Sequence, residues 1–240
     1  MQPMGVLPAA DLHAMLATFL SVTLPALWRL PCSNGDKEAL WRLAVNGVPG
    51  AGGHDICDRR PCACGWALPA QHTTTAERRR LVGAPMQRAH SFWDCAVARA
   101  VLQEVQLCLP AGVRLHQAHL WLCISPAPPV KLPVWRVVCV AALAAMWAGR
   151  RAMWARHLAG QPHAVTAAAR AAAVGFWRRL HNFVAVINTS SKSVQIAKWL
   201  GQETLGATHA FIRGEPLLMN PVYSVHYPAR GIALPADLLM

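Results

Sequence analysis

The chain has few acidic residues and lacks the sequence motifs of the common hydrolases and nucleotide-binding enzymes. Only 11 of its 240 residues are Asp or Glu, and no two aspartates are adjacent. It contains no GxxxxGK[ST] phosphate loop, no GxSxG nucleophile elbow and no HExxH zinc motif. A zinc deaminase needs a His-x-Glu to activate water, and this is missing too. We therefore expect a protein that is not an enzyme and has no small-molecule substrate.

The scarcity of acids leaves the chain strongly basic. Its 23 Lys and Arg residues give a formal net charge of +12 at pH 7. Such a charge suits a nucleic acid or an anionic membrane surface as partner. The alternative is GC-rich coding, which favours Arg, Ala, Gly, Pro and Trp without selection for a ligand. Hydrophobic residues make up 54% of the chain, which is ample for a buried core.

Signals for secretion and for membrane insertion are weak. No Lys- or Arg-led signal peptide precedes the apolar residues 14–28, and the eight cysteines do not form a disulfide framework. We therefore expect an intracellular protein, nuclear or cytoplasmic. The uncharged run from Val137 to Gly149 is shorter than the ~20 residues that cross a bilayer, so it favours a buried helix. The alternative is a helical, membrane-associated protein without a metal.

Helical periodicity dominates, and no segment alternates as a half-buried strand would, so we expect a mainly α fold. The clearest amphipathic stripe runs from Trp93 to Cys108. Residues 133–157 and 163–186 are long enough to pair as an antiparallel hairpin around Gly160. Shorter helices are expected at 11–20, 36–45 and 193–200.

These patterns divide the chain into five segments. They are an apolar N-terminal segment (1–35), a metal-binding domain (36–110), a proline-rich linker (111–132), a helical region (133–200) and a poorly ordered tail (201–240). Within the second segment, residues 50–69 are irregular and poor in apolar side chains, so they need a cross-link, such as a bound metal, to be ordered. Residues 71–87 read as an exposed polar insertion.

Three cysteines and a histidine can bind a metal that cross-links this segment. Cys62 and Cys64 stand one residue apart, and His90 and Cys95 come at the start of the amphipathic helix. A set of three Cys and one His suits tetrahedral zinc and leaves no position open for water, so the predicted zinc is structural. Because a one-residue spacing strains simultaneous binding by both cysteines, Cys57 is an alternative ligand.

The residues around these ligands resemble a known family. The stretch Leu40-Trp41-Arg42-Leu43, the pair in Cys62-Ala63-Cys64-Gly65 and the segment HSFWDCAVARAV (90–101) are similar to the zinc-binding region downstream of the polymerase in LINE-type, non-LTR reverse transcriptases. The resemblance covers residues 36–108 and implies a zinc knuckle followed by helices. In that family the gap between the cysteine pair and the histidine is shorter, so His72 is an alternative to His90. This chain lacks the paired aspartates of the polymerase, and the resemblance implies either a working module or a degenerate retrotransposon fragment.

The partner that the resemblance and the charge imply is RNA or DNA. Arg78, Arg79 and Arg80 lie between the two ligand pairs, and Arg88 lies just before His90. Arginines so close to the metal could meet phosphates. The alternative is a solvated loop without a ligand.

Overall fold

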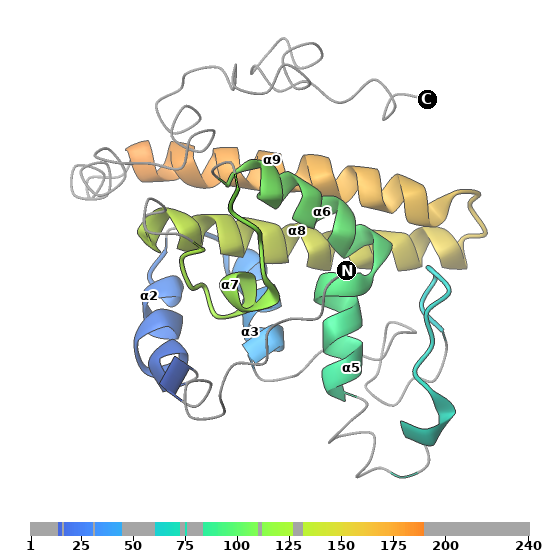
Figure 1. The fold of residues 1–240 in the computed structure, drawn as a ribbon. Helices are drawn as coiled ribbons and strands as arrows, with labels where there is room; N and C mark the ends of the chain where they lie inside the picture. The colour runs from blue at the N-terminus through green and yellow to red at the C-terminus, as the bar shows by residue number, and fades with distance from the viewer. Residues whose placement is uncertain are drawn as a thin grey trace.

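The computed structural model describes residues 14–15, 17–30, 32–44, 61–72, 75, 84–109, 112–126 and 132–189. Over these residues the fold is mainly helical and contains no strand, which confirms the expected fold class (Figure 1). The elements are η1 (Phe19–Thr23), α2 (Leu24–Trp28), α3 (Asn34–Ala44), η2 (Ala70–His72), α5 (Ala84–Ala89), η4 (His90–Asp94), α6 (Ala96–Leu107), α7 (Gln117–Trp121), α8 (Leu132–Leu158) and α9 (Ala164–Thr189).

The long helices α8 and α9 form the hairpin expected from the sequence, and α3, α6 and η4 pack on it (Figure 1). The chain reverses between them through Gly160, whose φ is +65°. Glycine adopts this left-handed backbone without steric cost, which is why it commonly follows the end of a helix. Helix α6 packs against both members of the hairpin, and α3 packs against α8.

The stretch of helix α8 from Val137 to Met146 is apolar on every side and lies at the centre of the core. All side chains from Val137 to Met146 are buried, and α3, α6, α9 and η4 all contact α8. A helix that is hydrophobic all round must be buried in protein or in lipid. Among the described helices, Trp135–Leu158 alone is long and apolar enough to cross a membrane, but 83% of its apolar window is buried inside the protein.

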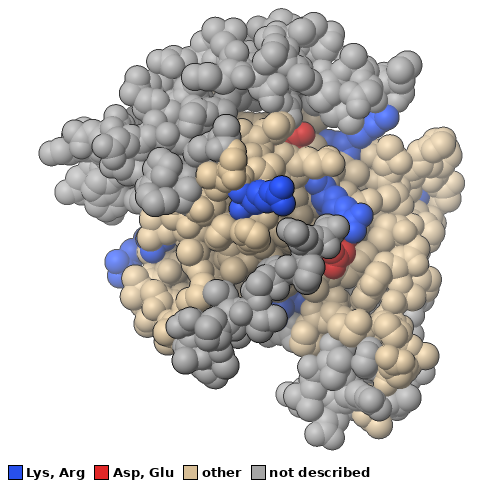
Figure 2. Space-filling model, in the orientation of Figure 1, with Lys and Arg blue, Asp and Glu red and all other residues tan. Residues whose placement is uncertain are grey.

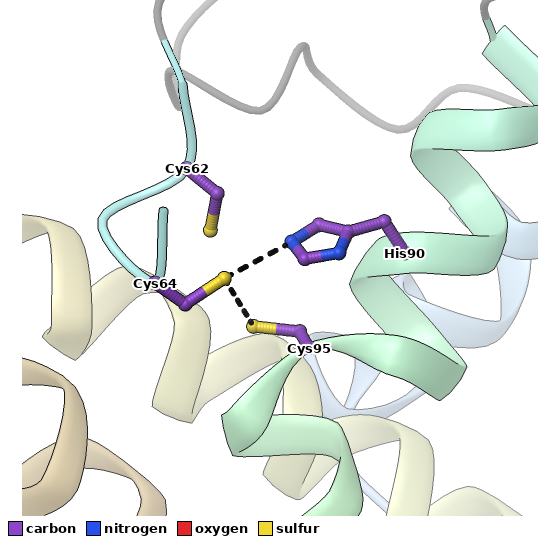
Figure 3. A group of neighbouring side chains, drawn as sticks. All are labelled: Cys62, Cys64, His90 and Cys95. Atoms are coloured by element: carbon purple, nitrogen blue, oxygen red, sulfur yellow. Dashed lines mark hydrogen bonds between the residues drawn. The ribbon is translucent and has the colours of Figure 1, made fainter. Parts of the chain in front are cut away.

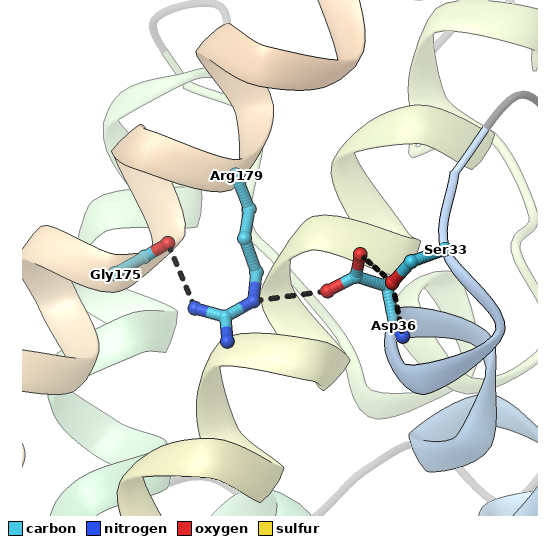
Figure 4. Close-up of polar contacts among 4 residues, drawn as sticks. All are labelled: Ser33, Asp36, Gly175 and Arg179. Carbon is cyan, nitrogen blue, oxygen red and sulfur yellow. Dashed lines mark hydrogen bonds and ion pairs between the residues drawn. The ribbon is translucent and has the colours of Figure 1, made fainter.

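A polar contact ties α3 to α9 across the hairpin. Arg179 Nε donates a hydrogen bond to Asp36 Oδ1 at 3.1 Å, and Arg179 Nη1 donates to the Gly175 carbonyl at 3.2 Å (Figure 4). The other carboxylate oxygen of Asp36 accepts a hydrogen bond from the Ser33 hydroxyl at 2.5 Å. Because Asp36 lies in the first turn of α3, its negative charge also interacts favourably with the partial positive charge at the N-terminus of the helix.

The N-terminal helix is longer than the sequence predicts. Periodicity places its end near Leu20, whereas helical structure continues through η1 and α2 to Trp28. Pro25 does not stop it: the backbone stays helical on both sides of the proline, which follows directly on the π-helical turn η1, a common way of accommodating an irregularity within a helix. The beginning of this helix, the predicted helix at 193–200 and the predicted tail lie outside the described residues.

Two segments in which the sequence indicates no helix contain short packed helices. The end of the polar insertion forms α5, and Gln87 within it is buried. The expected linker contains α7, which buries Leu120, and Cys123 just after it also joins the core. Helices of five or six residues gain their stability from packing rather than from intrinsic propensity, so periodicity does not reveal them.

Replacing Gly149 by alanine tests the close approach of α6, α8 and α9. A Cβ atom at this position would lie 2.6 Å from Ala172 Cβ and 2.7 Å from Val97 Cγ1, so the helices would have to separate. We expect Gly149→Ala to lower the free energy of unfolding in urea by about 1–3 kcal/mol. The control is Gly175→Ala, whose Cβ would meet the flexible end of Arg179 at 3.1 Å. Helix propensity should make that change neutral or stabilising by up to ~1 kcal/mol. Equal destabilisation by both substitutions would contradict the packing described.

Candidate metal centre

One half of the cluster is a tight turn that carries two cysteines. The Gly65 N–H donates to the Cys62 carbonyl at 2.7 Å, and the Cys62 N–H donates to the Trp66 carbonyl at 2.6 Å. Gly65 has a φ of +91°, a left-handed conformation that other residues rarely adopt. The turn folds the chain back between the two cysteines. It therefore brings both sulfurs toward the same point despite the one-residue spacing (Figure 3).

The other half lies where two helices meet. His90 begins η4, a π-helix of one turn. Cys95 is the N-cap of α6 and has an extended backbone, with φ −59° and ψ 145°. The Cys95 N–H donates to the His90 carbonyl at 2.7 Å. The sequence predicts a continuous helix from Trp93, but η4 ends at Asp94 and α6 begins at Ala96. This break points the two ligand side chains toward the cysteine turn (Figure 3).

The four expected ligands converge on one point. The ligand atoms of Cys62, Cys64, His90 and Cys95 all lie within 4.8 Å of one another. Cys64 Sγ lies 3.4 Å from His90 Nε2 and 4.0 Å from Cys95 Sγ. Zinc–sulfur bonds of ~2.3 Å and zinc–nitrogen bonds of 2.0–2.1 Å in a tetrahedron give ligand separations of about 3.8 Å (S–S) and 3.5 Å (S–N). The spacing is therefore compatible with a tetrahedral metal site.

The cluster is enclosed by protein. Cys62, His90 and Cys95 are each no more than 2% exposed, and Cys64 is half-buried. The indole of Trp66 stacks on the His90 ring, with centroids 4.2 Å apart and planes 7° apart. Trp66 thus covers one face of a ligand ring. The stacking fixes the plane of the imidazole whose Nε2 atom points at Cys64.

The three thiols perturb one another strongly. Hydrogen bonds from Cys62 and from Cys95 hold the pKa of the Cys64 thiol far below its usual range. The pKa of Cys95 is raised by its hydrogen bonds to Cys62 and Cys64, and the pKa of Cys62 is raised chiefly by its hydrogen bond to Cys64. Cys64 is thus a thiolate that accepts hydrogen bonds from the thiols of Cys62 and Cys95. A divalent cation at the centre would bind all three as thiolates and release the remaining protons.

The alternative ligands and three of the predicted phosphate contacts fall outside what the structure describes. Cys57 and Arg78–Arg80 lie outside the described residues, and of His72 only the backbone, at the end of η2, is described. The ligand set Cys62, Cys64, His90 and Cys95 is therefore the one that the structure brings together.

Arg88 is engaged inside the fold. Its guanidinium donates a hydrogen bond to the Leu43 carbonyl at 3.2 Å and lies 5.2 Å from the centre of the Trp121 ring. Burial lowers the pKa of Arg88. This side chain joins α5 to α3 and α7, and its predicted contact with phosphate stays a prediction.

Sequence reasoning did not single out Arg150, a buried arginine on α8. It is 3% exposed. Its signal in the sequence is a charge that follows directly on the apolar run ending at Gly149. Periodicity cannot distinguish such a residue from the exposed Arg151 beside it, because the face that a charged residue occupies depends on how the helix packs.

Comparison of the chain with protein-family models, with curated proteins and with solved structures finds no match. The resemblance to reverse-transcriptase zinc-binding regions therefore rests on the residues quoted for it. The geometry of the cluster does not depend on that resemblance, since it follows from the positions of the four side chains.

Removing the metal should destabilise the protein, and the effect should require Cys95. With free zinc ~1,000-fold above its dissociation constant, binding contributes about 4 kcal/mol, which a chelator would abolish. We expect this loss, measured by urea denaturation with and without EDTA, in the wild type but not in Cys95→Ser. The matched control is Cys32→Ser, a half-buried cysteine outside the cluster. It should respond to EDTA as the wild type does. A wild type indifferent to EDTA would contradict a metal centre.

Proposed function

We propose that this chain is a non-catalytic zinc-binding module that associates with nucleic acid, related to the zinc-binding region of LINE-type reverse transcriptases. The observation that carries the proposal is the convergence of Cys62, Cys64, His90 and Cys95 within 4.8 Å. The resemblance of residues 36–108 to that family supports the proposed association with nucleic acid. Since the parent family polymerises DNA on RNA, the proposed module is a remnant or accessory without the polymerase aspartates.

The donor set supports zinc as the metal. Thiolate and imidazole are the ligands that structural zinc prefers, whereas magnesium and calcium prefer oxygen. Four protein ligands fill a tetrahedron, so water has no coordination position from which it could be activated. The proposed zinc therefore holds the cysteine turn against η4 and α6 and performs no chemistry.

The charge of the described surface supports an anionic partner. Arg29, Arg99, Arg114, Arg151 and Arg178 are exposed. Of the carboxylates in the described part of the chain, only Asp94 is exposed, because Asp36 and Glu38 are half-buried and paired with arginines and Glu104 is buried. The face drawn in Figure 2 accordingly shows several patches of blue and little red. Phosphate contacts of this kind add affinity without reading sequence.

An apolar groove supports a second candidate function, association with a membrane. It is lined by Leu20, Leu24, Pro25, Trp28, Arg29 and Trp41 and has a volume of about 460 Å³. Leu20, Trp28 and Trp41 are each about half exposed, at 56%, 46% and 49%. Exposed Leu and Trp beside a cation are typical of helices that lie in a lipid interface. Flotation with anionic vesicles, lost in Trp28→Ser, would favour this candidate over nucleic-acid binding.

Nucleic-acid binding is tested by removing the arginines between the ligand pairs. We expect the triple variant Arg78→Gln, Arg79→Gln, Arg80→Gln to bind single-stranded RNA or DNA more weakly. The slope of log K against log salt should fall by about 2, since each phosphate contact contributes ~0.7 for a single strand. The measurement is fluorescence anisotropy over a salt series with zinc-loaded protein.

A control variant matches the loss of charge. The triple variant Arg114→Gln, Arg151→Gln, Arg178→Gln removes three exposed arginines elsewhere and should lower the slope less. Equal slopes in the two variants would mean that the charge acts without a defined site. Absence of binding at low salt by folded, zinc-loaded wild type would overturn the nucleic-acid proposal.

A further inference from the structure

A buried arginine lies in the middle of the central helix. Arg150 of α8 is 3% exposed, and burial lowers its pKa. The guanidinium remains charged under all ordinary conditions, and burying such a charge is costly unless an opposite charge accompanies it. The negative groups that act on Arg150 are the cysteines of the metal cluster.

Two neighbouring residues fix where Arg150 lies relative to the metal cluster. Gly149 lets α8 approach Val97, which is two residues beyond the ligand Cys95. Trp147, one turn before Arg150 on the same face of α8, stacks on Phe92 with ring centroids 6.2 Å apart. Phe92 lies in η4 between the ligands His90 and Cys95. Helix α8 thus packs against η4 and α6, the two elements on either side of Cys95, within one turn of Arg150.

The three cysteine sulfurs act on Arg150 electrostatically. Burial lowers the pKa of Arg150, and the charges of Cys62, Cys95 and Cys64 oppose that effect. The side chain is therefore within electrostatic reach of all three cysteine sulfurs in the cluster. The adjacent Arg151 is exposed on the same helix.

The charge of a loaded centre explains this arrangement. Three thiolates, one neutral imidazole and one divalent zinc carry a net charge of −1. We propose that Arg150 is the counter-ion of this metal–thiolate centre, so that zinc binding and the docking of α8 beside the cysteine turn support each other. This inference rests on the proposed zinc site. In it, Arg150 binds no metal and acts by neutralising the charge of the three cysteines.

Zinc affinity of Arg150 variants tests the proposal. We expect Arg150→Gln to weaken zinc binding about 10–100-fold, the range typical of residues that support metal ligands, as measured by competition with a chromogenic chelator. Arg150→Lys keeps the charge and should stay closer to wild type. Arg151→Gln removes the same charge from the exposed side of α8 and should bind zinc as wild type does. The cobalt(II) spectrum should stay that of a tetrahedral thiolate site in all of them.

A second readout separates a counter-ion from a residue that only fills space. By linkage, Arg150→Gln should destabilise the zinc-loaded protein more than the metal-free protein, whereas a packing role would destabilise both equally. If Arg150→Gln does not fold, Arg150→Lys decides: a folded, zinc-binding Lys variant supports the proposal, and an unfolded one overturns it. If Arg150→Gln binds zinc as tightly as the wild type, Arg150 is not the counter-ion, and the proposed zinc site is not affected by that result. A folded wild type that binds no zinc overturns the proposed function itself.

Discussion

The convergence of three thiols and one imidazole is the constraint on which the arrangement around them depends. The turn of residues 61–66 reaches the core through Cys62, which is 2% exposed, and through the stacking of Trp66 on His90. On the other side, Cys95 begins α6, which packs against α8 and α9. Whatever holds the four ligand atoms together therefore fastens an irregular turn to the helical hairpin. A metal does this better than the thiols alone, because it replaces one shared thiolate by four directed bonds.

The scarcity of acidic residues has a structural counterpart. In the described part of the chain, the carboxylates of Asp36 and Glu104 serve internal contacts. The first accepts a hydrogen bond from Arg179 across the hairpin at 3.1 Å, and the second accepts one from the Trp177 indole at 2.8 Å. With these acids used inside the fold, the exposed surface is left with an excess of arginine. The same composition that builds the tertiary contacts thus leaves a surface suited to an anionic partner.

The sequence predicted the elements that depend on local pattern. The mainly helical class, the α8–α9 hairpin and the amphipathic α6 follow from periodicity, and the ligand set follows from residue type combined with position before a helix. The break between η4 and α6 could not be predicted in this way, because residues 93–108 read as one continuous stripe. Nor could the roles of Trp66 and Arg150, whose surroundings are created by segments distant in the sequence. The small helix α7 was missed for the same reason, since Leu120 is buried only by tertiary contacts.

The most direct test of the account is X-ray absorption at the zinc edge on purified protein. A structural site made of Cys62, Cys64, His90 and Cys95 predicts one zinc per chain, with three sulfurs at ~2.3 Å and one imidazole nitrogen at 2.0–2.1 Å. Cys95→Ser should lose one sulfur or the metal altogether. A first shell dominated by oxygen, or a folded protein that retains no metal, would contradict the account.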